Sequence, residues 1–303
     1  MTKAEQILAR LSAEVADAAA AAAPSIVQVH GRPRRPASGI VVGRERVLTT
    51  SHSVEWEEGL MVTTGEGARL EATPVGHARG PDLVLLNVAG LDAPAVPFDR
   101  ETARPGEIAL LAGRSWRGQP SARLAMIGSI TGPLQTRDGT RLEGILSLTT
   151  SPYPGFSGSA LVGSGGTAIG IATAGIVRGA ALALPGPAVV AIMEAIERHG
   201  GVRRGFLGVT SQPARVPARQ RGSLARDAGL IVVGVAPDSP ADRAGLLVGD
   251  IMVQAAGADL EAPEDLLALL GPERVDQPLE MLVLRGTAQQ TVTVTVGERP
   301  SGR

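Results

Sequence analysis

Short apolar runs separated by turn-forming residues constrain the fold of this chain of 303 residues more than any other feature. Between Ser25 and Gly186, runs such as "SIVQVH", "SGIVVG" and "DLVLLNV" alternate with Gly, Pro or Asp. Their spacing of roughly eight to fifteen residues is typical of a β-barrel or β-sandwich. We therefore predict an all-β region here, followed by a helix in "GPAVVAIMEAIERHGG".

A second pattern follows the segment "GGVRRG" (200–205), which we interpret as a linker. It holds the run "GFLGV", the strand "GLIVVGVA", the stretch "SPADRAGLLVGD", the helix "APEDLLALL" and two further strands. A chain of this length is long enough to build two cores. We predict an N-terminal helical segment over 1–24, a β-domain over 25–200 and a small α+β domain over 204–299.

The residue types that the chain lacks exclude several kinds of chemistry. There is no cysteine, and therefore no disulfide, thiol nucleophile or thiolate metal site. Lys3 is the only lysine, which excludes a Walker phosphate loop and a Ser–Lys dyad. The four histidines show no metal-binding spacing, so we expect no metal and no cofactor. A net charge of −1 gives no electrostatic basis for binding nucleic acid.

The N-terminal stretch is typical of an amphipathic helix that ends at Pro24. Charged residues interrupt it where a secretory signal needs an unbroken apolar core, and no run approaches the length of a membrane span. We expect a cytoplasmic protein, with the periplasm as the alternative if the chain has been trimmed. The arginine-rich "GRPRRP" (31–36) is interpreted as a solvated loop.

Three motifs together predict a catalytic triad. "VLTTSHSV" places His52 after an apolar strand, "GPDLVLLNV" places Asp82 before another, and "PGFSGSAL" places Ser157 in a glycine-rich turn. Serine becomes a nucleophile when a base takes its proton and an acid orients that base. The order His, Asp, Ser is that of chymotrypsin-type enzymes; an α/β-hydrolase would need an acid between Ser157 and His199 that could orient it. Each residue alone has a structural alternative, but their order in a β pattern favours a catalytic site.

Two aromatic residues accompany that serine in a chain with one tyrosine and three phenylalanines. One interpretation makes Tyr153 and Phe156 an apolar lid or substrate-contact surface, with the Phe156 ring at the mouth of the cleft and supporting the Gly155 peptide. The alternative is that both rings pack against a neighbouring barrel.

With these motifs the chain resembles the HtrA family of trypsin-like serine proteases, in which a double β-barrel precedes a PDZ domain. The resemblance spans roughly residues 23–297 and is carried by "APSIVQV", "LTTSHSV", "PDLVLLNV", "PGFSGSALV", "IGIATA", "LALP", "RRGFLGV" and "VVGVAPDSPADRAGLLVGDIMVQAAG". It implies a mainly β fold, a chymotrypsin-like double β-barrel over 25–200 followed by a small α+β PDZ domain over 204–299. It also implies a serine endopeptidase of protein quality control that cleaves unfolded or damaged proteins.

The resemblance assigns a role to each residue of the expected site. His52 would be the general base, Asp82 the acid that orients it and Ser157 the nucleophile. The backbone N–H groups of Gly155 and Ser157 would form the oxyanion hole, since only glycine easily adopts the angles that aim such an amide inward.

The expected specificity pocket is uncharged. Ser151 stands where a trypsin-type pocket carries an acid, and the flanking strand offers only small residues, Ala172, Thr173 and Ala174. We therefore expect small or medium apolar side chains before the cut.

A PDZ domain holds a C-terminal carboxylate on the backbone amides of a loop while the peptide adds as a strand. "RRGFLGV" supplies this loop as Gly205, Phe206, Leu207 and Gly208, with Arg204 adding charge. The groove would be lined by three leucines, for which the alternative is a purely structural place in the core: Leu266, Leu267 and Leu270.

Two departures from the family pattern keep a second hypothesis open. Phe156 stands where the family usually has asparagine, and Ser159 stands where it usually has a second glycine. The alternative function is therefore a catalytically weak or silent PDZ-bearing scaffold or chaperone. The N-terminal segment also lacks the aromatic residues that commonly pack family trimers, so a homotrimer stays an open alternative.

Overall fold

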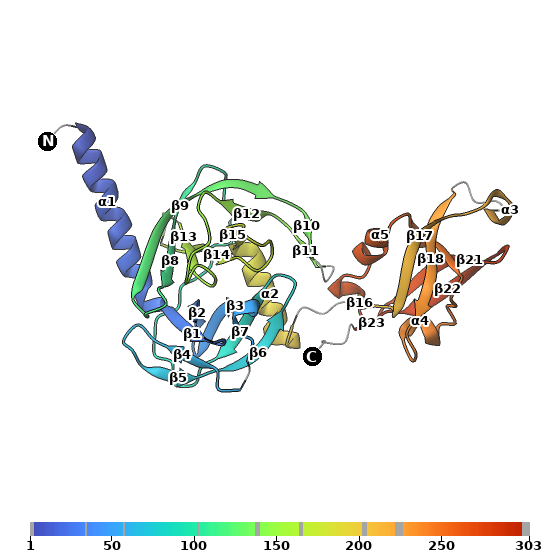
Figure 1. The fold of residues 1–303 in the computed structure, drawn as a ribbon, viewed down its shortest axis with the longest axis horizontal. Helices are drawn as coiled ribbons and strands as arrows, with labels where there is room; N and C mark the ends of the chain where they lie inside the picture. Colours follow the sequence, from blue (N-terminus) through green and yellow to red (C-terminus); the bar gives the residue numbers. More distant parts are fainter. Residues whose placement is uncertain are drawn as a thin grey trace. The chain divides into compact units, whose positions relative to one another are not determined.

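The computed structural model describes residues 3–33, 35–56, 58–101, 103–136, 140–163, 166–201, 205–221 and 227–298. The chain divides into two compact units, Met1–Val202 and Arg203–Arg303. The first is coloured blue to yellow in Figure 1 and the second orange to red. Each unit has its own apolar core.

The first half of the N-terminal unit is an antiparallel sheet of seven strands in the order β5-β4-β1-β2-β3-β7-β6. Valine and leucine side chains from successive strands form its core, because β-branched residues pack well on a pleated surface. The strands are β1 (Ile26–His30), β2 (Ala37–Gly43), β3 (Arg46–Thr50), β4 (Met61–Thr63), β5 (Arg69–Glu71), β6 (Thr73–Ala78) and β7 (Leu83–Asn87).

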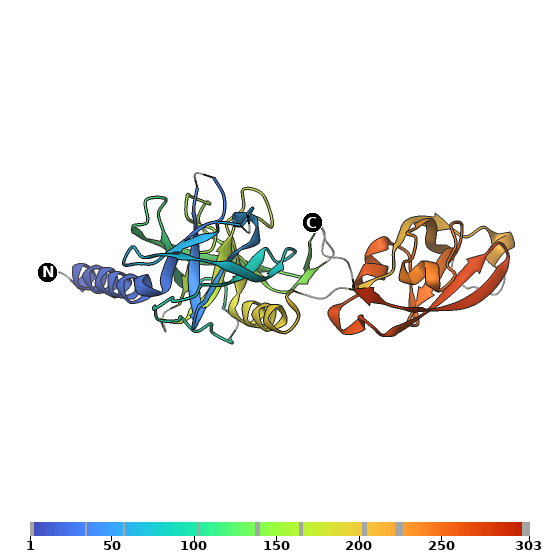
Figure 2. The same ribbon diagram turned by 90° about the horizontal axis from the view of Figure 1, so that it is seen from below.

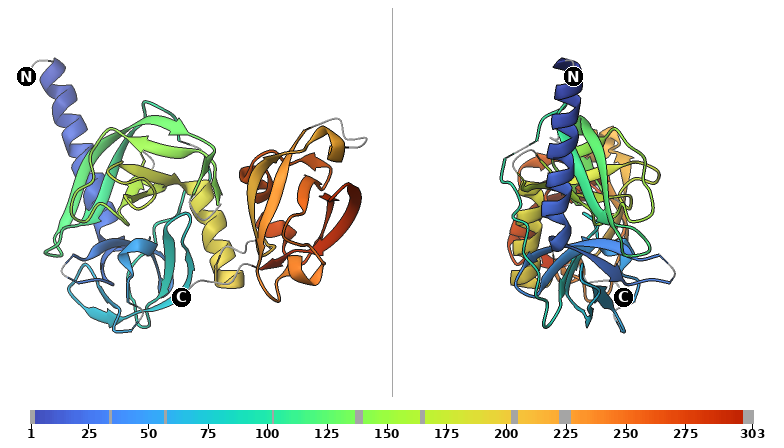
Figure 3. Two further views of the ribbon diagram at one scale, coloured as in Figure 1. Left: turned by 45° about the vertical axis from the view of Figure 1, so that its right-hand side comes forward. Right: turned by 90° about the vertical axis from the view of Figure 1, so that its left-hand side faces the viewer.

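The second half is a closed barrel of six strands in the order β12-β15-β14-β13-β8-β9, with a separate two-stranded hairpin, β10 and β11. Figure 3 shows the barrel, in green and yellow, beside the blue and cyan first sheet. The strands are β8 (Ile108–Arg114), β9 (Pro120–Thr131), β10 (Leu134–Gln135), β11 (Arg141–Leu142), β12 (Ile145–Leu148), β13 (Ala160–Val162), β14 (Ala168–Thr173) and β15 (Leu182–Pro185).

Helix α2 (Gly186–His199) closes the N-terminal unit. Its buried residues Val189, Ile192 and Ile196 recur at helical spacing and join a core that contains side chains of both halves. Gly200 ends the helix in the left-handed conformation, with φ of 71°.

Helix α1 (Lys3–Ala22) precedes the first strand and ends in a short 3₁₀ turn, Ala23–Ser25. Ala18, Ala19 and Ala22 pack in the core that contains side chains of both halves, whereas Ile7 and Leu8, near the start of the helix, are exposed. Figures 1 and 3 show this half of the helix extending beyond the strands. No helix in the described part of the chain is long and apolar enough to cross a membrane.

The C-terminal unit is a small α+β fold, shown from a second side in Figure 2. Its main sheet runs β17-β18-β19-β21-β22, β20 pairs with β19, and β16 pairs with β23. Its elements are β16 (Gly205–Phe206), β17 (Val209–Arg215), α3 (Ala218–Arg221), β18 (Ala228–Val235), α4 (Pro240–Arg243), β19 (Ile251–Ala255), β20 (Ala258–Asp259), α5 (Pro263–Ala268), a 3₁₀ turn (Pro272–Arg274), β21 (Pro278–Arg285), β22 (Ala288–Thr295) and β23 (Gly297–Glu298).

Candidate active site

His52 and Asp82 form the central pair of the site. His52 lies in a 3₁₀ turn that follows β3, and Asp82 directly precedes β7, which pairs with β3. The Nδ1 atom of His52 lies 2.7 Å from Oδ2 of Asp82, and the backbone N–H of His52 donates to Oδ1 at 2.9 Å. Because an ionised carboxylate only accepts hydrogen bonds, Nδ1 carries the proton of this bond and Nε2 is the nitrogen left to act as a base.

Thr173, at the end of β14, completes the surroundings of the buried Asp82 carboxylate. Its hydroxyl donates to Oδ2 and accepts the backbone N–H of Gly175 at 3.0 Å. Asp82 is 5% exposed, and these donors compensate for the water that the carboxylate loses. A Cβ at Gly175 would lie 2.4 Å from Asp82 Oδ2 and 2.5 Å from Nδ1 of His52, so this position admits only glycine.

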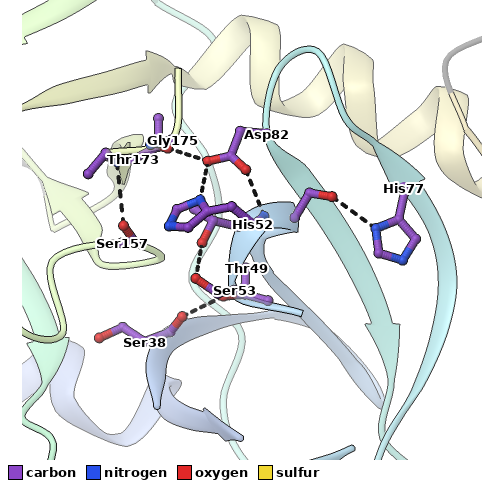
Figure 4. A network of polar contacts seen from close by, with 12 residues as sticks. Ser38, Thr49, His52, Ser53, His77, Asp82, Ser157, Thr173 and Gly175 are labelled. Atoms are coloured by element: carbon purple, nitrogen blue, oxygen red, sulfur yellow. Dashed lines mark hydrogen bonds and ion pairs between the residues drawn. The ribbon is translucent and has the colours of Figure 1, made fainter. Parts of the chain in front are cut away.

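Ser157 lies in the loop before β13, on the other side of the imidazole from Asp82 (Figure 4). Its hydroxyl accepts a hydrogen bond from the Ala174 N–H at 3.4 Å. Among the described residues that is its only hydrogen bond, so a nucleophilic step needs the hydroxyl to turn toward His52. Catalytic contacts of this kind are often loose before substrate binds.

The loop Tyr153–Phe156 has the geometry of a type II turn. Proline and glycine occupy its central positions, Gly155 has φ of 90°, and the Phe156 N–H donates to the Tyr153 carbonyl at 2.9 Å. A Cβ on Gly155 would lie 2.1 Å from the Arg114 carbonyl oxygen. Within the described part of the chain, the N–H groups of Gly155 and Ser157 have no acceptor, which leaves both amides available to a ligand.

Two buried hydroxyl groups hold the carbonyl group of Gly155. Ser38 Oγ and Ser159 Oγ each donate to this oxygen at 2.8 Å. The Ser38 hydroxyl itself accepts the Arg114 N–H at 2.8 Å, and its backbone N–H donates to the Ser157 carbonyl at 3.1 Å. We call Ser38 and Ser159 the carbonyl clamp, because both of their hydroxyl groups bond the Gly155 carbonyl.

The Phe156 ring is 1% exposed and belongs to the core of the second barrel. The interpretation that placed the ring at the mouth of the cleft is therefore wrong; the ring packs in a core, as the alternative expected, but in the core of its own barrel rather than against the neighbouring one. Its ring meets Tyr153 edge to face, with centroids 5.5 Å apart. Tyr153 does line the groove beside Ser157. Burial raises the pKa of Tyr153, although the Arg123 guanidinium, 3.7 Å from the ring centroid, opposes this.

Two hollows meet at His52, and we call them together the active-site groove. One, of about 600 Å³, holds Ser157 with Gly155, Tyr153 and Trp116. The other, of about 680 Å³, holds Asp82 with Leu134 and the segment 175–178. An extended chain that enters one hollow and leaves by the other passes both Ser157 and His52.

Of the four residues expected to form the specificity pocket, Ala174 lines the groove beside Ser157. Ala172 packs in the core of the second barrel, and Ser151 is exposed. Thr173 is fully buried and bonded to Asp82. The pocket thus stays a prediction, while the structure gives the Thr173 hydroxyl a role that the sequence did not suggest, as a donor to Asp82.

The expected carboxylate-binding loop of the C-terminal unit begins at β16. Gly205 donates its N–H to the Leu270 carbonyl at 3.0 Å, and Phe206 pairs with Gly297. The N–H groups of Leu207 and Gly208 have no acceptor among the described residues. Arg204 lies outside the described residues.

The three groove leucines differ in their surroundings. Leu266 is 5% exposed and lies in the core, whereas Leu267 is 38% exposed. Helix α5 ends at Ala268, so Leu270 lies in the turn after it and packs at the edge of the core. Helix α5 contacts β17, the strand that continues from the loop.

The sequence alone missed the carbonyl clamp and the role of the Thr173 hydroxyl. Ser38 stands in "ASGIVVG", a stretch predicted only as a strand, and Ser159 was noted only as a departure from glycine. In the described part of the chain, no cluster of His, Asp or Glu has the arrangement of a metal site.

The order and geometry of these elements define a class: a chymotrypsin-like double barrel with a serine-protease arrangement, followed by a PDZ-like unit. Comparison with known proteins agrees. A model of the trypsin-like peptidase domain matches residues 37–171, and one of the PDZ domain matches residues 205–296. Two curated relatives, both named probable periplasmic serine endoprotease DegP-like, come from Halomonas elongata and a Marinomonas strain.

The relative from Halomonas is 27% identical over 288 residues, which cover 92% of this chain and 60% of the relative. The relative from Marinomonas is 28% identical over 271 residues, which cover 87% of this chain and 57% of the relative. The chain thus spans less than two thirds of the curated relatives that it matches. The serine endoprotease from Yersinia pestis superposes with a TM-score of 0.73 at 26% identity, covering 94% of this chain and 98% of that one. The HtrA-type protease AlgW with tripeptide superposes with a TM-score of 0.69 at 27% identity, covering 95% of this chain and 98% of that one.

The chain thus combines a trypsin-like peptidase domain with a PDZ domain and is similar over most of its length to serine endoproteases of the HtrA type. This confirms the predicted resemblance and the predicted fold class.

Proposed function

We propose that this chain is a serine endopeptidase in which Ser157 attacks the peptide carbonyl, His52 acts as general base and Asp82 orients His52. The observation that carries this proposal is the bond of 2.7 Å between His52 Nδ1 and Asp82, in a groove that also holds Ser157. The bond directs the free lone pair of Nε2 away from Asp82 and toward the side of the nucleophile (Figure 4).

The chemistry follows in two stages. His52 takes the proton of Ser157 as the hydroxyl oxygen bonds to the carbonyl carbon, and then returns it to the leaving amine. Negative charge develops on the carbonyl oxygen, and the free N–H groups of Gly155 and Ser157 are the donors proposed to stabilise it. The acyl-enzyme is hydrolysed by water through the same steps, with water in place of the serine hydroxyl.

The alternative function is a weak or silent scaffold, and its basis was Phe156 and Ser159. Neither side chain faces the reacting groups: Phe156 packs in the barrel core, and Ser159 donates to the Gly155 carbonyl. Neither occupies the groove, which supports the enzyme over the scaffold.

The PDZ unit is proposed to bind the C-termini of peptides. The free N–H groups of Leu207 and Gly208 would hold the carboxylate, and the peptide would lie as an added strand beside β17, with Leu267 exposed on the neighbouring helix. Amidation of the peptide's C-terminus should then abolish this binding. The proposed substrates are unfolded or damaged polypeptides, and the names of the curated relatives support the periplasmic alternative for location.

The test compares casein hydrolysis by the wild type with that by Ser157→Ala and His52→Ala. If the residues act as a triad, each substitution should lower kcat by about 10⁴–10⁶, and the double variant should lose little more than either alone. Undiminished cleavage by Ser157→Ala, in protein freed of host proteases, would refute the proposal.

A further inference from the structure

Four arginines line the active-site groove. Arg32 and Arg35 line the hollow that holds the nucleophile, and Arg79 and Arg178 line the hollow on the other side of the imidazole. Among the described residues that line either hollow, Asp82 is the only one with a carboxylate, and its oxygens are already bonded within the site. The described residues therefore give each of the two hollows an excess of positive charge.

These arginines are not neutralised by the protein itself. None of the four makes an ion pair with a carboxylate in the described part of the chain, whereas Arg104 pairs with Glu107 at 2.9 Å. Arg35, Arg79 and Arg178 are exposed, and Arg32 is half-buried. The Nε of Arg32 donates to the Arg35 carbonyl at 2.9 Å, which ties the two ends of this loop together.

The positive charge of the groove is not a property of the whole chain. The chain as a whole carries a net charge of −1, so the groove concentrates positive charge in a nearly neutral molecule. A cleft lined by one sign of charge focuses the field and attracts ligands of the opposite sign. The guanidinium group also binds carboxylates in a planar, two-point arrangement that an ammonium group cannot form.

We propose that this groove selects acidic polypeptide segments, with Asp or Glu on both sides of the bond that is cut. The inference rests on the proposed peptidase function and specifies its substrate class. In this proposal the residue before the cut is uncharged and faces Ala174, and the acidic residues on the two sides of the cut face the arginines of the two hollows. The arginine-rich loop, interpreted from sequence as merely solvated, thereby becomes part of the substrate-binding surface.

The experiment uses fluorescence-quenched decapeptides with one valine before the cut and an amidated C-terminus, which removes the proposed PDZ contact. Three peptides carry Glu, Gln or Lys at two positions on each side of the valine bond. An exposed ion pair contributes up to about fivefold in affinity, so we expect kcat/KM for the Glu peptide to exceed that for the Gln peptide by on the order of tenfold or more. The Lys peptide should be cleaved most slowly, and the difference should shrink as added salt screens the charges.

The variant Arg32→Gln, Arg35→Gln, Arg79→Gln, Arg178→Gln should lose this preference: the ratio of kcat/KM for the Glu peptide to that for the Gln peptide should fall toward one, mainly through a higher KM for the Glu peptide. Arg44→Gln, Arg100→Gln serves as the control: both arginines are exposed and outside the groove. The control should retain the preference. Equal cleavage of the three peptides by the wild type, or an equal loss in both variants, overturns the inference and leaves the peptidase function standing.

A binding measurement separates this inference from the peptidase function. Ser157→Ala protein should bind the fluorescein-labelled Glu peptide more tightly than the Lys peptide by a similar factor, whether or not the wild type cleaves either one. If the wild type cleaves none of the peptides but the Ser157→Ala protein still binds the Glu peptide more tightly than the Lys peptide, the proposed peptidase function is refuted. The inference that the groove binds acidic segments then stands. An oligonucleotide of equal charge that displaces the Glu peptide as well as the Glu peptide itself would overturn the assignment of a polypeptide ligand.

Discussion

Removal of the carbonyl clamp should disable the oxyanion hole without touching any reacting group. Ser38 and Ser159 each donate to the Gly155 carbonyl at 2.8 Å. A Cβ at Gly113 would lie 2.3 Å from the Ser159 hydroxyl, so the space beside that hydroxyl is filled. Either hydroxyl alone still holds the carbonyl. The two substitutions Ser38→Ala and Ser159→Ala should therefore be more damaging together than the sum of their separate effects.

The magnitudes follow from the bonds. A net hydrogen bond contributes about 0.5–1.5 kcal/mol, so each single variant should lose about two- to tenfold in kcat. Loss of an oxyanion donor costs about 10²–10³ in rate, and the double variant should approach that figure, because Gly155 is held through its carbonyl and its release lets the residue rotate and redirect its own N–H. KM should change little, because the clamp does not contact substrate.

The assay combines three measurements on each variant: kcat and KM with an amidated peptide, the inhibition constant of a peptide boronic acid, and the melting temperature. The boronic acid forms a tetrahedral adduct, so its affinity should fall in step with kcat. Ser25→Ala, which also removes a buried hydroxyl from this unit, controls for general loss of stability. A double variant that stays folded and retains wild-type kcat would refute this account of the turn.

Three further predictions follow from single contacts. Thr173→Val keeps the shape of the side chain but removes a donor to Asp82; kcat should fall by about ten- to a hundredfold with KM unchanged, since bonds to charged groups contribute about 1.5–3 kcal/mol. Gly175→Ala places a methyl group against the His52–Asp82 pair and should abolish labelling by an active-site phosphonate while the melting temperature of the PDZ unit stays the same. Asp250→Asn should lower the free energy of unfolding of the PDZ unit by about 1.5–3 kcal/mol at pH 7, measured by urea denaturation, because it removes the negative charge and one of the two oxygens that Arg285 binds at 2.8 and 2.7 Å.

The effect at Asp250 has a defined pH dependence. Burial alone would raise the pKa of this carboxyl group, but the bonds from Arg285 and from the Leu247 N–H hold it below its usual 3.8. A carboxyl group with a lowered pKa in the folded state stabilises the fold above its unfolded pKa and loses that contribution as pH falls through the folded value. The difference in stability between wild type and Asp250→Asn should thus be full above about pH 4 and decline below it. An equal difference at pH 7 and pH 3 would contradict this.

The parts of the fold that depend on local pattern were predictable from sequence. Apolar runs between turn residues gave the strands, and helical spacing with Gly200 after it gave α2. His52 and Asp82 were identifiable because each stands at the end of a strand, in the order that one class of enzyme uses. Their contact of 2.7 Å follows from the pairing of β3 with β7, which brings those ends together.

The parts that depend on distant partners were not predictable. Ser38 and Gly155 are 117 residues apart, and nothing in "ASGIVVG" indicates that a hydroxyl there will face a particular carbonyl group. The direction of the Thr173 side chain depends on the register of β14 with β15, in which Thr173 pairs with Leu182. Phe156 was placed at the cleft from its neighbours in sequence, but the barrel core beside it buries the ring.

The most direct test of the central claim is the reaction of the protein with a biotin-tagged fluorophosphonate, followed by mass spectrometry of the labelled peptide. The account predicts one adduct per chain, on Ser157, lost in His52→Ala and slowed strongly in Asp82→Asn, because the nucleophile needs its base and the base needs its orienting acid. Labelling at another serine, or equal labelling of Ser157 in the wild type and His52→Ala, would contradict it.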